Sequence, residues 1–325
     1  MKHLAALLLT TFTLSASTAV RCDAETIRVA MQKTGTFAWE LAVIRAHGLD
    51  KQANLSIEPI ELASPEAGKV ALRAGSADII VSDWPWVSRE RSLGGKLTFY
   101  PYSSALGAVM VRNDSTIRTL ADLKGHTLAV AGGPIDKSWL LLQASLKQDG
   151  TDLKATSNII YGAPPLLAAK ALSGETDATL DYWNFCAALE AKGFRRLAGI
   201  DDILPKLGAK GPTAMIGYVF DETWGNAHAD LLARFIAATR QAKEILASSD
   251  AEWSRIQSLT GATDAATLRV YRDRYREGIP RRSIAEEEGD ARVLYRVLAK
   301  IGGPDLVGPA PQLDPGTFYH AIPGG

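Results

Sequence analysis

The sequence predicts an α/β fold built as two lobes, with two hinge crossings between them. Short β-rich runs alternate with helical stretches, which is the pattern of α/β proteins. Two segments, 99–112 and 214–220, interrupt this alternation, and we interpret them as strands that cross between lobes. Lobe 1 would then comprise residues 25–103 and 217–325, and lobe 2 residues 104–216.

The first predicted lobe begins with strands and helices in turn. Its predicted helices cover 39–46 and 66–74, and its predicted strands cover 27–31, 55–62 and 77–81. Ser64 followed by Pro65 is typical of an N-cap with proline at the first helical position, and Gly75 is typical of the end of the same helix.

The second predicted lobe continues the alternation. Its predicted elements are a short helix at 120–125 capped by Thr119, strands at 127–131, 159–161 and 177–180, a helix at 139–148 and a helix after Pro164 and Pro165. The last hundred residues are predicted to be mainly helical, because residues 229–247 place apolar side chains at helical spacing.

The composition excludes several classes of function. A chain of 325 residues with 46% hydrophobic residues can bury one large core or two ordinary ones. Its 36 basic and 36 acidic residues cancel, so no net charge is available to hold nucleic acid or an anionic membrane. We therefore expect no nucleic-acid partner, and we expect a monomer.

Residues 1–24 are predicted to be a cleaved secretory signal peptide. A short basic start precedes an apolar run from Leu4 to Leu14, and small residues follow it. Cleavage after Ala19 or after Ala24 fits the small-residue rule, and we favour Ala24 because a strand is predicted to start close behind it. The mature protein is therefore predicted to be exported.

The two cysteines, Cys22 and Cys186, give no support to a disulfide framework, a zinc site or a cysteine nucleophile. Cleavage after Ala24 would remove Cys22, and Cys186 is then predicted to be a small buried hydrophobic residue. We predict no cofactor, no metal site and no catalytic residue.

Ligands of open α/β sheets bind in the crevice outside the carboxyl ends of the strands, where helix N-termini direct their amides. That rule selects the residues that follow each predicted strand: 34–39, 63–64, 82–86, 132–139 and 181–184.

Aromatic residues are frequent in these segments. Trp84 and Trp86 flank Pro85 in the stretch SDWPW, where the proline favours an extended backbone at Trp84 and places Asp83 at a helix cap. Both tryptophans are predicted to flank the cleft. Further aromatic residues at such positions are Phe37, Trp39, Trp139, Tyr182 and Trp183. The sequence therefore predicts an aromatic-lined slot, and packing of individual tryptophans in the lobe cores is the alternative.

Three acids, Asp83, Asp136 and Asp181, fall at the same kind of position. Carboxylates close together repel each other unless a positive ligand, a metal or a lysine is present, and Lys33 and Lys137 are the nearest lysines in the sequence. Aromatic faces also hold cations. The cleft is therefore predicted to favour a cationic, amine-bearing or heteroaromatic ligand, although each acid could instead serve as a helix cap.

Three motifs resemble those of the periplasmic substrate-binding proteins of ABC importers of the nitrate, sulfonate and taurine type, a family that also includes binders of thiamine pyrimidine precursors. Residues 71–78 (ALRAGSAD) and 171–178 (ALSGETDA) are similar to two glycine-containing segments of that family. The third motif consists of residues 109–115 (VMVRNDS) together with residues 120–125 (LADLKG).

The resemblance implies a two-lobed fold of the second periplasmic-binding type, which closes on a ligand and is recognised by a membrane permease. It also implies that Ser104 lies near the hinge. The predicted ligand-binding residues are Thr36, Phe37, Trp39, Ser64, Asp83, Trp84, Trp86, Ser104, Gly133, Asp136, Asp181, Tyr182 and Trp183.

Sulfonate and nitrate binders are expected to use cationic or amide donors, and the acids and tryptophans of this chain depart from that pattern. Two alternatives stay open. One is a metal or metal-chelate binder that uses the cleft aspartates as hard oxygen ligands. The other is an enzyme that acts on a pyrimidine-type precursor, as relatives of this fold do.

Overall fold

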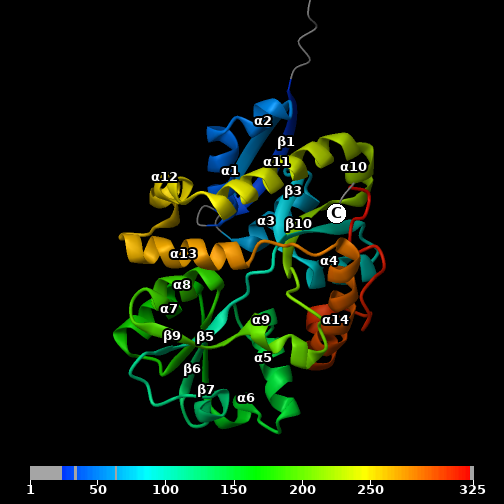
Figure 1. Cartoon of the computed structure of the whole chain (residues 1–325). Coiled ribbons are helices and arrows are strands. Elements are labelled where there is room, and N and C mark those ends of the chain that lie inside the picture. The colour runs from blue at the N-terminus through cyan, green and yellow to red at the C-terminus, as the bar shows by residue number, and fades with distance from the viewer. Residues whose placement is uncertain (1–23, 33–34, 63, 323–325) are drawn as a thin grey trace, which may run out of the picture.

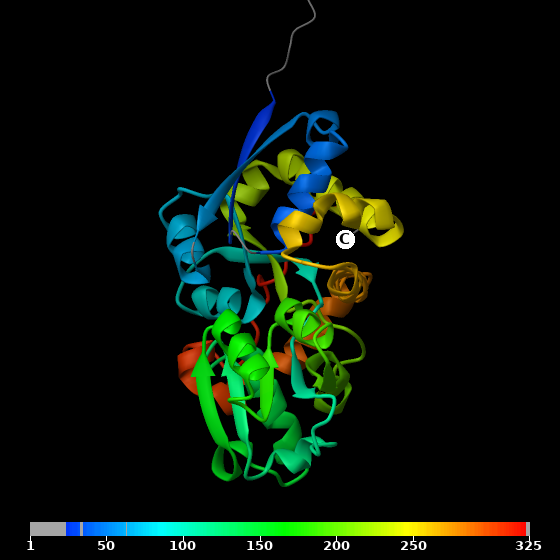
Figure 2. The same cartoon turned by 90° about the vertical axis from the view of Figure 1, so that its left-hand side faces the viewer.

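The computed structural model describes residues 24–32, 35–62 and 64–322, and it shows two lobes stacked one above the other (Figure 1). Within the described residues the strands form two five-stranded sheets, one in each lobe. The view from the side shows the same separation (Figure 2). The predicted α/β class and its two-lobed arrangement are therefore confirmed.

The first sheet has the strand order β2-β1-β3-β10-β4. Its strands are β1 (Glu25–Gln32), β2 (Leu55–Leu62), β3 (Ile79–Asp83), β4 (Leu97–Ser103) and β10 (Ile216–Asp221). Strand β1 is parallel to β2 and β3, whereas β10 is antiparallel to β3 and β4. The parallel strands therefore all end on one edge of the sheet.

The second sheet repeats this plan with the order β7-β6-β8-β5-β9. Its strands are β5 (Ala108–Arg112), β6 (Thr127–Ala131), β7 (Asn158–Gly162), β8 (Ala178–Asp181) and β9 (Phe194–Gly199). Strands β6, β7 and β8 are parallel, and β5 is antiparallel to β8 and β9.

The helices follow the strands in chain order. Between β1 and β4 they are α1 (Phe37–Ala46), α2 (Leu49–Gln52), α3 (Pro65–Arg73) and α4 (Trp84–Ser92). Between β5 and β10 they are η1 (Leu120–Leu123), α5 (Lys137–Gln148), α6 (Leu153–Thr156), α7 (Pro164–Ser173), α8 (Trp183–Glu190), α9 (Ile200–Ile203) and η2 (Pro205–Leu207). After β10 they are α10 (Glu222–Ala227), α11 (Ala229–Ser248), α12 (Asp250–Thr260), α13 (Ala265–Glu277) and α14 (Ile284–Val307).

The chain leaves the first sheet through residues 104–107 and returns through residues 208–215. The C-terminal helices contact both lobes. Helix α14 packs against α4 of the first lobe and α5 of the second, and α13 packs against α8 of the second (Figure 1). Arg274 of α13 donates two hydrogen bonds, of 2.6 and 3.0 Å, to the carboxylate of Glu190 in α8. The lobe boundaries given above stay a prediction.

Residues near the C-terminus lie beside the outer strand of the first sheet. The backbone N–H of Phe99 in β4 donates to the carbonyl of Thr317 at 2.8 Å, and the N–H of Tyr319 donates to the carbonyl of Phe99 at 2.9 Å. The Phe318 ring packs edge-on against the Phe99 ring at 5.1 Å. This segment therefore covers the free edge of β4.

Of the predicted signal peptide, all but Ala24 lies outside the described residues. Cys22 and Lys33 also lie outside them. In the part of the chain that the structure describes, no helix has the length and apolar character that a membrane crossing requires. Cys186 is buried, as the sequence predicts.

Candidate functional site

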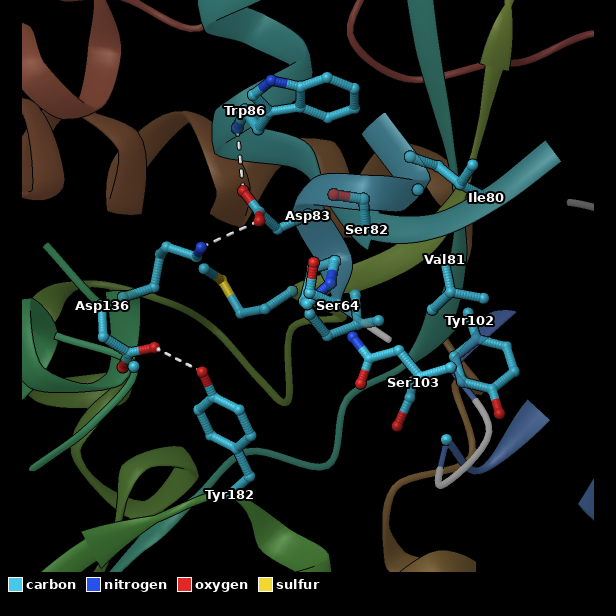
Figure 3. A pocket seen from close by; sticks show the side chains of 18 of the residues that line it. Ser64, Ile80, Val81, Ser82, Asp83, Trp86, Tyr102, Ser103, Asp136 and Tyr182 are labelled. Carbon is cyan, nitrogen blue, oxygen red and sulfur yellow. Dashed lines mark hydrogen bonds and ion pairs between the residues drawn. The ribbon is translucent and has the colours of Figure 1, made fainter. Parts of the chain in front are cut away.

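A cavity of about 560 Å³ lies between the lobes (Figure 3). The first lobe lines it with residues at the carboxyl ends of its parallel strands, including Met31 in β1 and Asp83 in β3. The second lobe lines it with Gly132 after β6 and Tyr182 after β8. The cavity therefore lies where the strand-end rule places a ligand.

Helices α1, α3, α4, α5 and α8 all begin at this cavity. Three of these helices have a side-chain cap that accepts a hydrogen bond from a first-turn amide. The caps are Ser64 for α3 (3.2 Å), Asp83 for α4 (2.9 Å) and Asp136 for α5 (2.9 Å). These amides therefore already have an acceptor. The N-caps of α1 and α8, Thr36 and Tyr182, make no such side-chain bond.

An ion pair crosses the cavity from one lobe to the other. The ammonium of Lys137 in α5 lies 2.9 Å from Oδ2 of Asp83, whose residue is only 6% exposed (Figure 3). Burial acts to raise the pKa of Asp83, but the charges of Lys137 and Lys69, together with two hydrogen bonds, lower it on balance. Asp83 is thereby held as a carboxylate.

A second carboxyl faces the same space. The Tyr182 hydroxyl donates a long hydrogen bond of 3.4 Å to Oδ2 of Asp136 (Figure 3). Burial raises the pKa of Asp136, and the nearby charge of Asp83 adds to this rise. Gly132 is required beside this pair, since its φ is +87° and a Cβ would lie 2.7 Å from the Tyr182 hydroxyl.

Aromatic rings form much of the cavity wall. The wall includes the rings of Phe37, Trp86, Tyr102 and Trp183. The Tyr102 and Thr36 hydroxyls are 3.0 Å apart and share a hydrogen bond, which fixes the Tyr102 ring. Such walls suit a planar or partly apolar organic ligand.

The structure brings most of the predicted residues together. Those that line the cavity are Thr36, Phe37, Ser64, Asp83, Trp86, Asp136, Tyr182 and Trp183. Their contact with a ligand stays a prediction.

Trp84 and Trp39 do not line the cavity, contrary to the sequence-based prediction. Trp84 is fully buried against Tyr295, at a ring distance of 6.1 Å. The extended residue is Asp83 (φ −111°, ψ 148°), and the helix begins at Trp84 itself. Residues two apart point about 200° apart around a helix. Trp86 and Phe37 therefore face the cavity, while Trp84 and Trp39 face the core.

Asp181, Ser104 and Gly133 also lie outside the cavity lining. Asp181 is 1% exposed, and its Oδ1 accepts a bond from the following backbone N–H at 2.8 Å. Ser104 bonds through both its backbone N–H and its hydroxyl to the carbonyl of Gly278, so it faces the hinge. Gly133 has no side chain to offer, and its neighbour Gly132 lines the cavity instead.

Sequence reasoning did not include Lys137, Lys69, Tyr102 and Met215 among the ligand-binding residues, although all four line the cavity. Lys137 was recognised only as a possible partner of the acids. Tyr102 lies at the end of β4 and Met215 directly before β10, at the two crossings. The interrupted alternation at those segments was the signal that could have identified them.

The protein is expected to lose stability relative to Asp181→Asn as the pH rises from 4 to 8. Burial raises the pKa of Asp181 from 3.8 to about 8. In this window the folded protein keeps a proton that the unfolded chain releases, so each rise in pH favours unfolding. Urea unfolding across the range should show a relative loss of at least about 1.4 kcal/mol, the equivalent of one pKa unit. Parallel pH curves for the two proteins would contradict this assignment.

In the described part of the chain, no three His, Cys, Asp or Glu side chains are grouped so that they could hold a metal ion. The three predicted acids do not form a common site, since Asp83 pairs with Lys137 and Asp181 is buried away from the cavity. The described residues therefore give no support to the metal alternative.

One of three comparisons with known proteins identifies a family. A model of the family described as NMT1/THI5 like matches residues 41–252. A comparison with curated proteins finds no match.

Many solved structures share the fold, and three of them serve as examples. The periplasmic aliphatic sulphonate binding protein SsuA from Escherichia coli is 19% identical, with 91% of this chain and 94% of that chain covered and a TM-score of 0.70. The alkanesulfonate-binding protein SsuA from Xanthomonas axonopodis pv. citri, bound to MOPS, is 19% identical, with 90% and 97% covered and a TM-score of 0.66. The desulfurization enzyme DSZB is 16% identical, with 92% and 96% covered and a TM-score of 0.60.

Proposed function

Because the chain belongs to the NMT1/THI5-like family, we propose that it is a periplasmic solute-binding protein that captures a small organic solute between its lobes and delivers it to an ABC importer. This membership agrees with the family resemblance of the sequence motifs. The proposal includes export by a cleaved signal peptide, action as a monomer and recognition by a membrane permease.

The observation that supports capture most directly is the interlobe cavity. Its volume of about 560 Å³ is in the range of small-molecule sites, and both lobes contribute polar groups to it. A solute that contacts both lobes stabilises the closed arrangement over any open one, because it binds the closed state better. No chemical step is required for that role.

The ligand is proposed to be amine-bearing or heteroaromatic. Asp136 makes no ion pair with any described residue, so its Oδ2 is available to a donor group of a ligand. The acids that cap α4 and α5 occupy amides that an oxyanion would otherwise use. The charge of Asp136, which has no ion-pair partner among the described residues, also repels an anion. The aromatic wall offers faces on which a flat ring stacks.

A sulfonate is the second candidate, and one observation favours it. Helix α8 begins at the cavity without a side-chain cap, which leaves its first-turn amides available to an anion. In α1, by contrast, the amides of Ala38 and Trp39 already donate to the carbonyls of Gly35 and Thr36. Two of the proteins with the same fold carry sulfonate binding in their names. The two candidates differ in which helices hold the charged end of the solute.

We propose transport rather than catalysis, although one protein of the same fold is named an enzyme. Burial raises the pKa of the Cys186 thiol to about 12, and its Sγ donates to the carbonyl of Asp181 at 3.1 Å. A protonated, buried thiol is a poor nucleophile. Cys186 therefore gives the enzyme alternative no support.

Replacing Asp136 by asparagine is expected to weaken binding of an aminopyrimidine by about 10- to 150-fold, the equivalent of about 1.5–3 kcal/mol for a charge-assisted hydrogen bond. The amide oxygen of asparagine can still cap α5, so the fold should be retained. Isothermal titration with an aminopyrimidine and with an alkanesulfonate tests both candidates.

Asp152→Asn is the matched control, because Asp152 caps α6 with a 3.3 Å bond and does not line the cavity. Unchanged aminopyrimidine affinity in Asp136→Asn would remove Asp136 from the site. Binding of the alkanesulfonate alone by the wild-type protein would replace the first candidate by the second. Native mass spectrometry of freshly purified protein would identify any solute that it retains.

A further inference from the structure

Lys137 lies near two carboxylates, Asp83 and Asp136, but forms an ion pair only with Asp83. It is the first residue of α5 in the second lobe, and its ammonium reaches Oδ2 of Asp83 in the first lobe. Oδ1 of Asp83 accepts from the backbone N–H of Trp86 at 2.9 Å (Figure 3). Each oxygen of the Asp83 carboxylate therefore already has a strong donor, and neither depends on a ligand.

Asp136, the residue before Lys137, is in the opposite situation. Its Oδ1 accepts from the backbone N–H groups of Ser138 and Trp139 at 2.9 and 3.3 Å. Its Oδ2 has only the long 3.4 Å bond from Tyr182. Among the described residues, Asp136 therefore presents the less satisfied carboxylate oxygen to the cavity.

We propose that Lys137 is a specificity-determining residue, whose ammonium acts as a resident counter-ion for Asp83 and leaves Asp136 as the carboxylate that meets a donor group of the ligand. The inference rests on the proposed capture of a solute in this cavity. A cavity with one available carboxylate selects a solute with a single positive group. Without the Lys137 ammonium, the cavity would present one carboxylate from each lobe, which matches a solute with two positive groups.

Lys137→Gln is the informative change, because it removes the positive charge and leaves the Asp83 cap of α4 in place. Lys137→Arg keeps the charge. Lys69→Gln is the matched control for charge alone. Lys69 also lines the cavity and its charge also acts on Asp83, but its ammonium is 5.0 Å from the centre of the Trp86 ring and makes no bond to Asp83.

The probes are 1,4-diaminobutane and 1-aminobutane, titrated calorimetrically into each protein. Lys137→Gln is expected to bind the diamine at least about tenfold more tightly than the wild-type protein does, the gain of one charge-assisted contact. Its affinity for the monoamine should change less. Lys137→Arg should behave as the wild type, and Lys69→Gln should gain less than a third of the diamine effect.

No gain of diamine affinity in Lys137→Gln would overturn the inference. Equal gains in Lys137→Gln and Lys69→Gln would also overturn it, since net charge alone would then explain the effect. If the wild-type protein binds neither amine but Lys137→Gln binds the diamine, the inference is supported while the amine-bearing solute of the proposed function is not.

A measurement without ligand tests the ion pair itself. Carbon-detected NMR titration, with the Asp83 signal assigned through Asp83→Asn, should show the Asp83 carboxyl titrating at a higher pH in Lys137→Gln than in the wild type. Equal midpoints in the two proteins would mean that the pair does not form in solution, and would overturn the inference whatever the ligand.

Discussion

Replacing Lys243 by methionine is expected to lower the free energy of unfolding by about 3–5 kcal/mol, the effect of removing one partner from a buried ion pair. The Lys243 ammonium lies 2.5 Å from Oε2 of Glu40, which is fully buried in α1. Removing the ammonium leaves the Glu40 carboxyl without a positive partner in an apolar interior. Chemical unfolding followed by tryptophan fluorescence measures the loss.

Tyrosines surround this pair and complete its hydrogen bonding. The Tyr275 hydroxyl donates to Oε1 of Glu40 at 2.6 Å, and the Tyr218 hydroxyl donates to Oε2 at 3.4 Å. The Lys243 ammonium also lies 4.0 Å from the centre of the Tyr102 ring. Burial lowers the pKa of Lys243, and the charge and hydrogen bond of Glu40 oppose that lowering only in part.

The double variant Glu40→Met with Lys243→Met distinguishes the effect of the ion pair from the effect of lost side-chain volume. Two methionines restore apolar volume and leave no unpaired charge, so most of the lost stability should return. Gln241→Met is the control on the same helix, because Gln241 is exposed and its replacement should change stability by no more than about 0.5 kcal/mol. A double variant as unstable as Lys243→Met would show that the ion pair is not the source of the loss.

Replacing Trp39 by alanine is expected to cost about 3–5 kcal/mol, the usual range for truncating a buried tryptophan. The Trp39 ring packs edge-on against the rings of Trp183, Trp253 and Tyr271, each at 5.8 Å. Its Nε1 donates to the carbonyl of Leu259 at 3.2 Å. Because Trp183 belongs to the second lobe, the substitution also loosens the contact between lobes.

Trp39→Phe is the graded control, since a phenyl ring refills most of the space but cannot donate to Leu259. We expect it to recover more than half of the lost stability in the same unfolding measurement. A Trp39→Ala protein of normal stability that fails to bind the solute would instead restore Trp39 as a ligand contact, as the sequence alone had predicted.

Local signals in the sequence were sufficient for most of the fold. The predicted strands 55–62 and 127–131 coincide with β2 and β6, and Ser64 with Pro65 begins α3 as predicted. Strand β9 was not predicted, because Arg195 and Arg196 interrupt its apolar pattern. These arginines are tolerated there because β9 is an edge strand that pairs only with β5.

The candidate site was predictable by segment but not by side chain. The strand-end rule selected the segments that surround the cavity, yet it could not say which side chain of a helical first turn faces inward. Trp84 and Trp86 show the difficulty, since the residue at which the helix begins decides which of the two side chains faces the cavity. Pairing across the lobes, as between Asp83 and Lys137, depends on how two separate sheets are placed, and no local pattern encodes that.

The backbone contacts of residues 317–319 with β4 have a consequence for self-association. An outer strand with unpaired N–H and C=O groups is a template on which another molecule can add a strand. Here that template is occupied by the protein's own chain. Shortening the protein to before residue 317 would expose the template and invite ordered aggregation, so affinity tags and fusion partners are best attached without disturbing this segment.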